Sequence, residues 1–171
     1  MTRKLMLASV IASLLLAGCS SQAGDYMAAS SITKGGFARD GEQIRALAGN
    51  EVKLWGFVDH GNVYGDEGAK AILGDWWSGP GPDATTWRFD LKARAGDAVG
   101  KSFAVTVPND EGRDALLRRF VEDARAGNPT RVFLTGRIDA FDAPTSNATL
   151  TGLTMELRSS RDILFAPPEV R

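Results

Sequence analysis

Two segments of the chain share one alternating pattern, in which a glycine occupies the third apolar position. Residues 52–58 read VKLWGFV and residues 132–138 read VFLTGRI. Successive side chains of a strand point to opposite faces, so Val, Leu and Gly share one face in each segment. A glycine inside a strand permits a sharp bend or a close backbone approach because it has no Cβ atom. The pattern therefore predicts two strands that bend strongly, at Gly56 and at Gly136.

Apolar and polar residues also alternate elsewhere, and each alternation predicts a strand. With the two glycine-containing segments included, strands are predicted over residues 51–58, 86–92, 102–107, 131–141 and 153–157. Between the third and fourth strands, residues 111–126 place apolar side chains at helical spacing after a polar start, which predicts a helix. A shorter helix is predicted after Asp40, because aspartate commonly caps helix N-termini.

This order of elements and the spacing of the two glycines resemble an OB-fold. The OB-fold is a five-stranded Greek-key barrel, and the family carries its helix between strands 3 and 4. The resemblance covers about residues 50–160 and implies a mainly β domain in which Gly56 and Gly136 lie where strands bend around the barrel. It carries no catalytic signature, so it implies a fold rather than a function. A sandwich of four or six strands with a side helix is the alternative architecture.

The N-terminus has the features of an export signal. Arg3 and Lys4 precede an uncharged, mostly apolar run from Leu5 to Gly18, which is too short to span a bilayer. The run ends in Leu16-Ala17-Gly18-Cys19, which resembles the lipobox of bacterial lipoproteins. The resemblance implies that Cys19 is lipidated and becomes the first mature residue. Ser20 in the next position favours the periplasmic side of the outer membrane, so the membrane is an expected partner through the lipid anchor.

The chain is therefore predicted to have four parts. Residues 1–18 are the signal peptide, and residues 19–38, which are rich in Ser, Ala and Gly, form a flexible tether. Residues 39–166 form one OB-like domain, and residues 167–171 form a tail.

The net charge and the scarcity of cysteine and histidine limit the kinds of binding and catalytic site that the chain can form. The chain has 20 Lys and Arg against 21 Asp and Glu, and removal of Arg3 and Lys4 with the signal peptide leaves a net charge of −3. That balance lacks the basic excess typical of nucleic-acid binding, so nucleic acid is a disfavoured partner. One cysteine and one histidine cannot supply the usual ligands of a zinc site, and neither a metal nor a cofactor is expected. His60 is the single candidate catalytic base, and no nucleophile motif accompanies it.

The segment from Asp59 to Thr85 is predicted to be a long loop that carries large aromatic residues. Aromatic side chains on a loop can stack on sugar rings or bury area against a protein partner. Together with the turn at 144–149, the loop is the predicted partner-binding surface. Its candidate residues are Tyr64, Trp76, Trp77, Pro144 and Asn147. The alternative is that the loop aromatics fold back onto the barrel as a small additional core.

These observations favour a non-catalytic envelope lipoprotein whose OB-like domain binds a protein or a glycan. Three alternatives stay open. The first is a hydrolase-like enzyme that uses the carboxylates of the loop, Asp59, Asp66, Glu67 and Asp75. The second is a domain that binds single-stranded nucleic acid, as some OB-folds do. The third is a purely structural lipoprotein.

Overall fold

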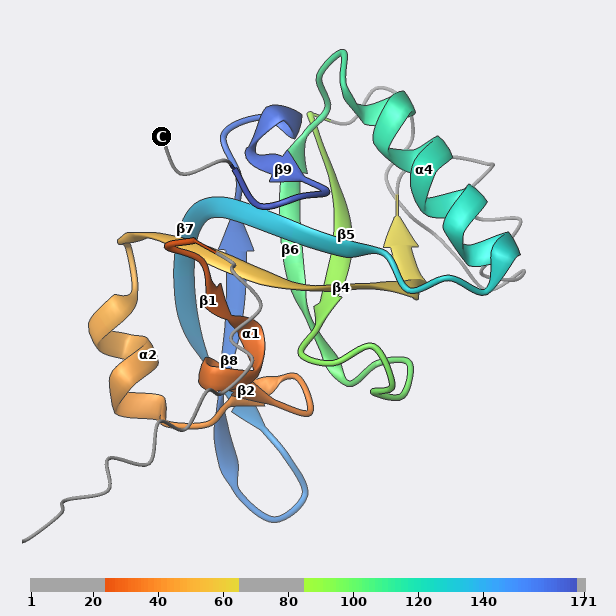
Figure 1. Cartoon of the computed structure of the whole chain (residues 1–171). Coiled ribbons are helices and arrows are strands. Elements are labelled where there is room, and N and C mark those ends of the chain that lie inside the picture. Colours follow the sequence, from red (N-terminus) through yellow and green to blue (C-terminus); the bar gives the residue numbers. More distant parts are fainter. Residues whose placement is uncertain (1–23, 65–84, 169–171) are drawn as a thin grey trace, which may run out of the picture.

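The computed structural model describes residues 24–64 and 85–168, and its centre is a closed five-stranded barrel (Figure 1). The barrel strands are β4 (Glu51–Tyr64), β5 (Thr86–Lys92), β6 (Ser102–Pro108), β7 (Arg131–Pro144) and β8 (Thr149–Glu156). β4 pairs with β5 and β7, β5 with β6, and β7 with β8, all antiparallel, while a parallel pairing of β6 with β8 closes the barrel. This is the OB-like arrangement that the sequence predicted, with helix α4 (Arg113–Ala126) between the third and fourth barrel strands.

The two predicted bends lie where β4 and β7 change partners. Residue 57 of β4 pairs with both β5 and β7, and residue 137 of β7 pairs with both β4 and β8. Gly56 and Gly136 come directly before these positions. A Cβ atom on Gly56 would lie 2.8 Å from the carbonyl oxygen of Lys92, and one on Gly136 would lie 2.5 Å from that of Glu156. Only glycine permits so close an approach of the neighbouring backbone.

Apolar side chains from all five strands fill the barrel. Trp87, Phe89 and Leu91 of β5 are almost fully buried, as are Phe103, Val105 and Val107 of β6, so the predicted faces of both strands are confirmed. Helix α4 covers one end of the barrel, where its Phe120 ring lies 5.3 Å from that of Phe89. The helix ends at Gly127, whose φ of 70° is the left-handed conformation common after helices.

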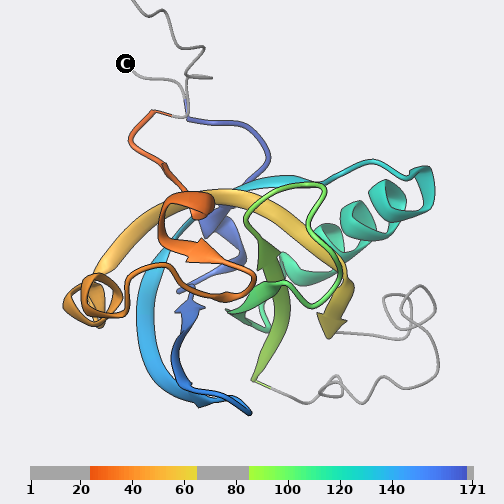
Figure 2. The ribbon, with the colours of Figure 1, turned by 90° about the horizontal axis from the view of Figure 1, so that it is seen from below.

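The predicted short helix is α2 (Gly41–Leu47), which lies on the opposite side of the barrel from α4 (Figures 1 and 2). The carboxylate of Asp40 accepts hydrogen bonds from the backbone N–H groups of Glu42 and Gln43, so its predicted capping role is confirmed. Ile44 is fully buried and fastens the helix to the barrel. Within the described residues, no helix is both long enough and apolar enough to cross a membrane.

The prediction of a flexible tether through residue 38 is wrong for residues 26–38. They form β1 (Met27–Ala28), α1 (Ala29–Ile32), β2 (Thr33–Lys34) and β3 (Phe37–Ala38). Strand β1 pairs in parallel with β4, β3 pairs with β8, and the side chains of Ala29 and Ile32 are buried. Elements of two to four residues are too short to show a periodicity, and tertiary packing stabilises them instead.

Strand β4 continues six residues beyond its predicted end at Val58. The pairing with β5 shifts between Asp59 and Val63, so the residues between them form a bulge. The prediction of a loop from Asp59 onwards is therefore wrong as far as Tyr64. After β8, the 3-10 helix η1 (Ser160–Asp162) leads into β9 (Ile163–Leu164), which pairs with β7.

Candidate functional site

The predicted partner-binding residues fall on separate parts of the molecule. Cys19, Trp76 and Trp77 lie outside the described residues. Tyr64 is half-buried at the end of β4, where its hydroxyl donates to Oδ1 of Asn62 and its ring lies 4.5 Å from the guanidinium of Arg88.

Pro144 and Asn147 are exposed at the tip of the hairpin that joins β7 and β8. Residues 139–152 of this hairpin, which we call the β7–β8 arm, project beyond the barrel (Figures 1 and 2). At the tip, the backbone N–H of Thr145 donates to the carbonyl of Ala148, 2.8 Å away, and the Thr145 hydroxyl donates to the same carbonyl.

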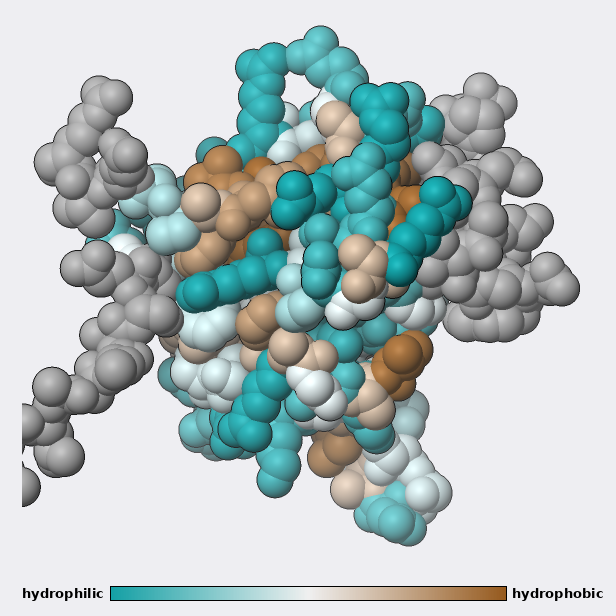
Figure 3. All heavy atoms as spheres, turned by 45° about the vertical axis from the view of Figure 1, so that its right-hand side comes forward, coloured by the Kyte–Doolittle hydropathy of each residue, from teal (hydrophilic) through white to brown (hydrophobic). Residues whose placement is uncertain are grey.

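The outer face of the β7–β8 arm carries large apolar side chains near its tip. Phe141 pairs with Gly152 and Ala143 with Leu150, so these side chains share one face of the ribbon. The Phe141 ring lies over Gly152, where a Cβ atom would come within 2.3 Å of it, yet the residue remains 48% exposed. Leu150 is 39% exposed. In the space-filling view the arm projects at the lower right, and a separate apolar area lies at the upper left of the same face (Figure 3). The arm therefore presents two large apolar side chains to solvent.

A second surface is a groove of about 420 Å³ beside the bulge of β4, which we call the β4 groove. Phe57 and His60 of β4, Lys92 of β5, residues 95–96 and residues 127–129 line it. The ammonium group of Lys92 donates to the backbone carbonyls of Ala95 and Asp97, both 3.2 Å away, and so ties the loop after β5 to the groove wall.

His60 joins β4 to the far side of the groove through a chain of hydrogen bonds. Its Nε2 lies 2.8 Å from the hydroxyl of Thr130, which in turn lies 2.7 Å from Oδ2 of Asp123. Burial lowers the pKa of His60, and Lys92 lowers it further, while the carboxylates of Asp123 and Asp59 act in the opposite direction. No sequence pattern indicates these hydrogen bonds, because Thr130 lies 70 residues from His60.

Two carboxylates face each other across β4 and β5, at the register pair Asp59 and Asp90. Asp59 is fully buried and accepts hydrogen bonds from Gly61 N, Asn62 Nδ2, Gly100 N and Ser102 Oγ. Its carboxylate therefore holds the bulge against the β5–β6 loop.

Burial raises the pKa of Asp90 to about 6, although the nearby Arg88 lowers it in part. Its Oδ1 lies 3.3 Å from Nε of Arg88, close enough for an ion pair but without hydrogen-bond geometry. Asp90 is thus an incompletely paired, largely buried carboxylate on the outside of the barrel.

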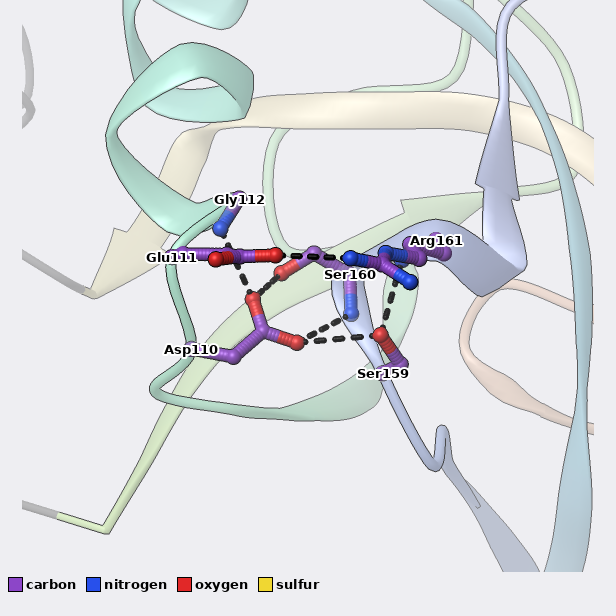
Figure 4. A network of polar contacts seen from close by, with 6 residues as sticks. All are labelled: Asp110, Glu111, Gly112, Ser159, Ser160 and Arg161. Atoms are coloured by element: carbon purple, nitrogen blue, oxygen red, sulfur yellow. Dashed lines mark hydrogen bonds and ion pairs between the residues drawn. The ribbon is translucent and has the colours of Figure 1, made fainter.

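A third cluster joins the start of α4 to η1 (Figure 4). The Asp110 carboxylate accepts hydrogen bonds from the hydroxyl groups of Ser159 and Ser160 and from the backbone N–H groups of Gly112 and Ser160. Burial by itself would raise the pKa of Asp110, but these hydrogen bonds outweigh it and lower the pKa. A carboxylate with a lowered pKa is a weak base, so this cluster is suited to fastening two elements rather than to activating a serine.

Comparison with known proteins leaves the chain without an assigned family. No family model matches it, and no curated protein matches it. Among solved structures, an OBody bound to hen egg-white lysozyme matches with 18% identity and a TM-score of 0.34, over 70% of this chain and 88% of that chain. A second OBody bound to the same lysozyme matches with 20% identity and a TM-score of 0.32, over 67% of this chain and 82% of its own. The aspartyl-tRNA synthetase from Entamoeba histolytica matches with 14% identity and a TM-score of 0.39, over 100% of this chain and 28% of that chain.

Proposed function

We propose that this chain is a non-catalytic lipoprotein of the bacterial outer membrane that binds an envelope protein through its β7–β8 arm. Acylation of Cys19 would hold the domain on the periplasmic side. Because one acyl chain gives only marginal membrane binding, the several chains expected by resemblance to lipoproteins supply a firm anchor.

The observation that carries the proposal is the pair of exposed apolar side chains on the arm. Phe141 and Leu150 lie together on one face of a two-stranded ribbon, and a two-stranded ribbon is only marginally stable without further packing. Exposed apolar side chains that lie together on a projecting element are typical of surfaces that bind another protein. A partner that covers both side chains would remove them from water and support the ribbon.

The position of the arm also favours this use. The described chain starts at Gly24 on the side of the barrel away from the arm, as both ribbon views show (Figures 1 and 2). A chain anchored close to that start would direct the arm away from the bilayer surface. Residues 19–24 span at most about 20 Å when extended, so the lipid would lie close to the opposite side of the domain.

The side chains on the outer faces of β5 and β6 disfavour binding of single-stranded nucleic acid. OB-folds that bind single strands stack bases on aromatic side chains of the corresponding strands. Here Trp87, Phe89 and Phe103 all point into the barrel core, and the outer face of β5 carries Arg88 and Asp90.

The test is capture of envelope proteins by the purified full-length protein in detergent, quantified for the wild type and for a Phe141→Ser, Leu150→Ser double variant. Loss of two buried apolar contacts should weaken a specific complex at least about 10-fold. Val99→Ser is the matched control, because Val99 is 65% exposed on the separate loop between β5 and β6. Capture that survives in the double variant, or that is lost equally in the control, would rule out the arm as the binding surface.

A further inference from the structure

The single histidine of the chain is directed into the β4 groove by an irregularity of its strand. His60 lies within the bulge between Asp59 and Val63, where β4 departs from regular pairing with β5. A bulge redirects a side chain that regular alternation would place elsewhere. His60 consequently reaches across to Thr130, at the start of β7 and beside the end of α4.

The hydrogen-bond chain determines which nitrogen of His60 carries the proton. An ionised Asp123 only accepts, so the Thr130 hydroxyl must donate its proton to Asp123 Oδ2. The hydroxyl oxygen can then only accept from His60, which makes Nε2 the protonated nitrogen. In neutral His60, Nδ1 is therefore an acceptor, and none of the described residues donates a hydrogen bond to it.

The surroundings keep His60 neutral near pH 7. Burial is the largest influence and lowers its pKa, with Lys92 of β5 acting in the same direction. Asp123 of α4 and Asp59 of β4 oppose it without reversing the shift. The groove thus contains a histidine held as an acceptor rather than as a cation.

The rest of the groove disfavours charged ligands. Residues 127–129 directly follow the C-terminus of α4, and the negative end of a helix dipole disfavours an anion. Lys92 disfavours a cation, and two of its three N–H donors already bind the loop carbonyls. Phe57 adds a half-buried apolar ring beside these polar groups.

We propose that the β4 groove binds a neutral glycan, with a sugar hydroxyl donating to Nδ1 of His60 and the apolar face of the sugar against Phe57. Sugars combine hydroxyl donors with an apolar C–H face, which matches the acceptor and ring that this groove offers. The site is distinct from the β7–β8 arm, and the proposal requires neither the arm nor the lipid anchor.

The first experiment measures binding of chitohexaose, a neutral hexasaccharide, to the purified full-length protein by calorimetry at pH 7.5 and pH 4.5. Where imidazole nitrogen NMR shows that His60 has become protonated at the lower pH, Nδ1 is no longer an acceptor, so affinity should fall at least fivefold while circular dichroism shows the domain still folded. His60→Phe keeps a planar ring without the acceptor and should weaken binding at pH 7.5 by at least fivefold. No binding by the wild type, or affinity unchanged in His60→Phe, would overturn the proposal.

Two further probes separate other ligand classes. Hyaluronan hexasaccharide is a glycan with carboxylates, and acetyl-(Ser-Gly)3-amide is an uncharged peptide with hydroxyl donors. Tighter binding of hyaluronan, especially at pH 4.5, would assign an anion site instead, and tighter binding of the peptide would assign a peptide site. Either result overturns the proposal.

A second measurement tests the tautomer without any ligand. Imidazole nitrogen NMR of the wild type at pH 7.5 should show a neutral ring protonated at Nε2, and Thr130→Val should allow the other tautomer to appear. A ring protonated at Nδ1 in the wild type would contradict the inference. The Phe141→Ser, Leu150→Ser variant should bind chitohexaose normally, so failure of the arm and failure of the groove give different results.

Discussion

Gly56 of β4 and Gly136 of β7 occupy equivalent positions in the barrel. Gly56 lies opposite Val132, Gly136 lies opposite Val52, and each comes one residue before the position at which its strand begins to pair with a second barrel strand. The two segments share one sequence pattern because both strands bend at a position where a neighbouring backbone comes very close.

Replacement of Gly136 by alanine should destabilise the domain strongly. The new Cβ would lie 2.5 Å from the carbonyl oxygen of Glu156 and 2.6 Å from Cδ2 of Leu157, so backbone and core would both have to move. We expect a loss of about 2–4 kcal/mol in the free energy of unfolding, measured by urea denaturation. Gly96→Ala is the control, because its Cβ would meet nothing within 4 Å. Equal stability of the two variants would contradict this account of the bend.

Asp90→Asn should stabilise the protein at neutral pH. Because burial raises the pKa of Asp90 from 3.8 to about 6, the folded state binds the proton more tightly than the unfolded state. The stability that protonated Asp90 contributes is fully present below about pH 4 and is lost as the pH rises through about 6. At pH 7.5 the variant should be more stable by about 1–2 kcal/mol, discounted for partial exposure, and the difference should disappear near pH 4.

Thermal unfolding of both proteins from pH 4 to pH 8 measures this difference. Asp139→Asn, at an exposed position of β7, provides the comparison. A variant that is less stable than the wild type at pH 7.5 would show that the Asp90 carboxylate is stabilised by its pairing with Arg88.

Asp110→Asn should have the opposite effect. The charged carboxylate accepts four hydrogen bonds that join α4 to η1, and the amide cannot replace all of them. We expect the free energy of unfolding to fall by about 2–4 kcal/mol at pH 7. Because the pKa of Asp110 is lowered in the folded protein, this stabilisation is present above about pH 4 and is lost as the pH falls through the lowered pKa.

Glu111→Gln is the adjacent control for Asp110. The Glu111 side chain is 82% exposed in its ion pair with Arg161, and exposed pairs of this kind contribute less than about 1 kcal/mol. If both substitutions lowered the free energy of unfolding by the same small amount in denaturant titrations, the Asp110 hydrogen bonds would not hold α4 to η1.

Cys19→Ser should release the protein from the membrane. Without a thiol at this position the lipid cannot be attached, and no other anchor is proposed. Fractionation of cells that express the variant should recover it outside the membrane fraction, while the wild type sediments with the outer membrane. A serine variant that still sediments with the membrane would contradict the proposed anchor.

The barrel strands could be predicted from the sequence where apolar and polar residues alternate regularly and only one face of the strand is buried. The 86–92 segment matches the bounds of β5, and Asp40 caps α2 as predicted. The N-terminal segment was missed because its elements have two to four residues each, and their stability comes from packing against β4 and β8.

The site was predictable only in part. Residues 59–62, Asp-His-Gly-Asn, have the composition of a turn, and only Val63 and Tyr64 after them indicate that a strand resumes. The acceptor role of His60 depends on Thr130 and Asp123, which reach it through the fold rather than through proximity in sequence. Pro144 and Asn147 were predicted as contact residues, yet the exposed apolar residues beside them are Phe141 and Leu150.

The most direct test of the central claim is photo-crosslinking in intact cells. A photoreactive phenylalanine analogue placed at position 150 of the β7–β8 arm should give a discrete crosslinked product with one envelope protein, whereas the same analogue at position 99 should not. Absence of any product at position 150, or identical products at both positions, would contradict a binding function for the arm.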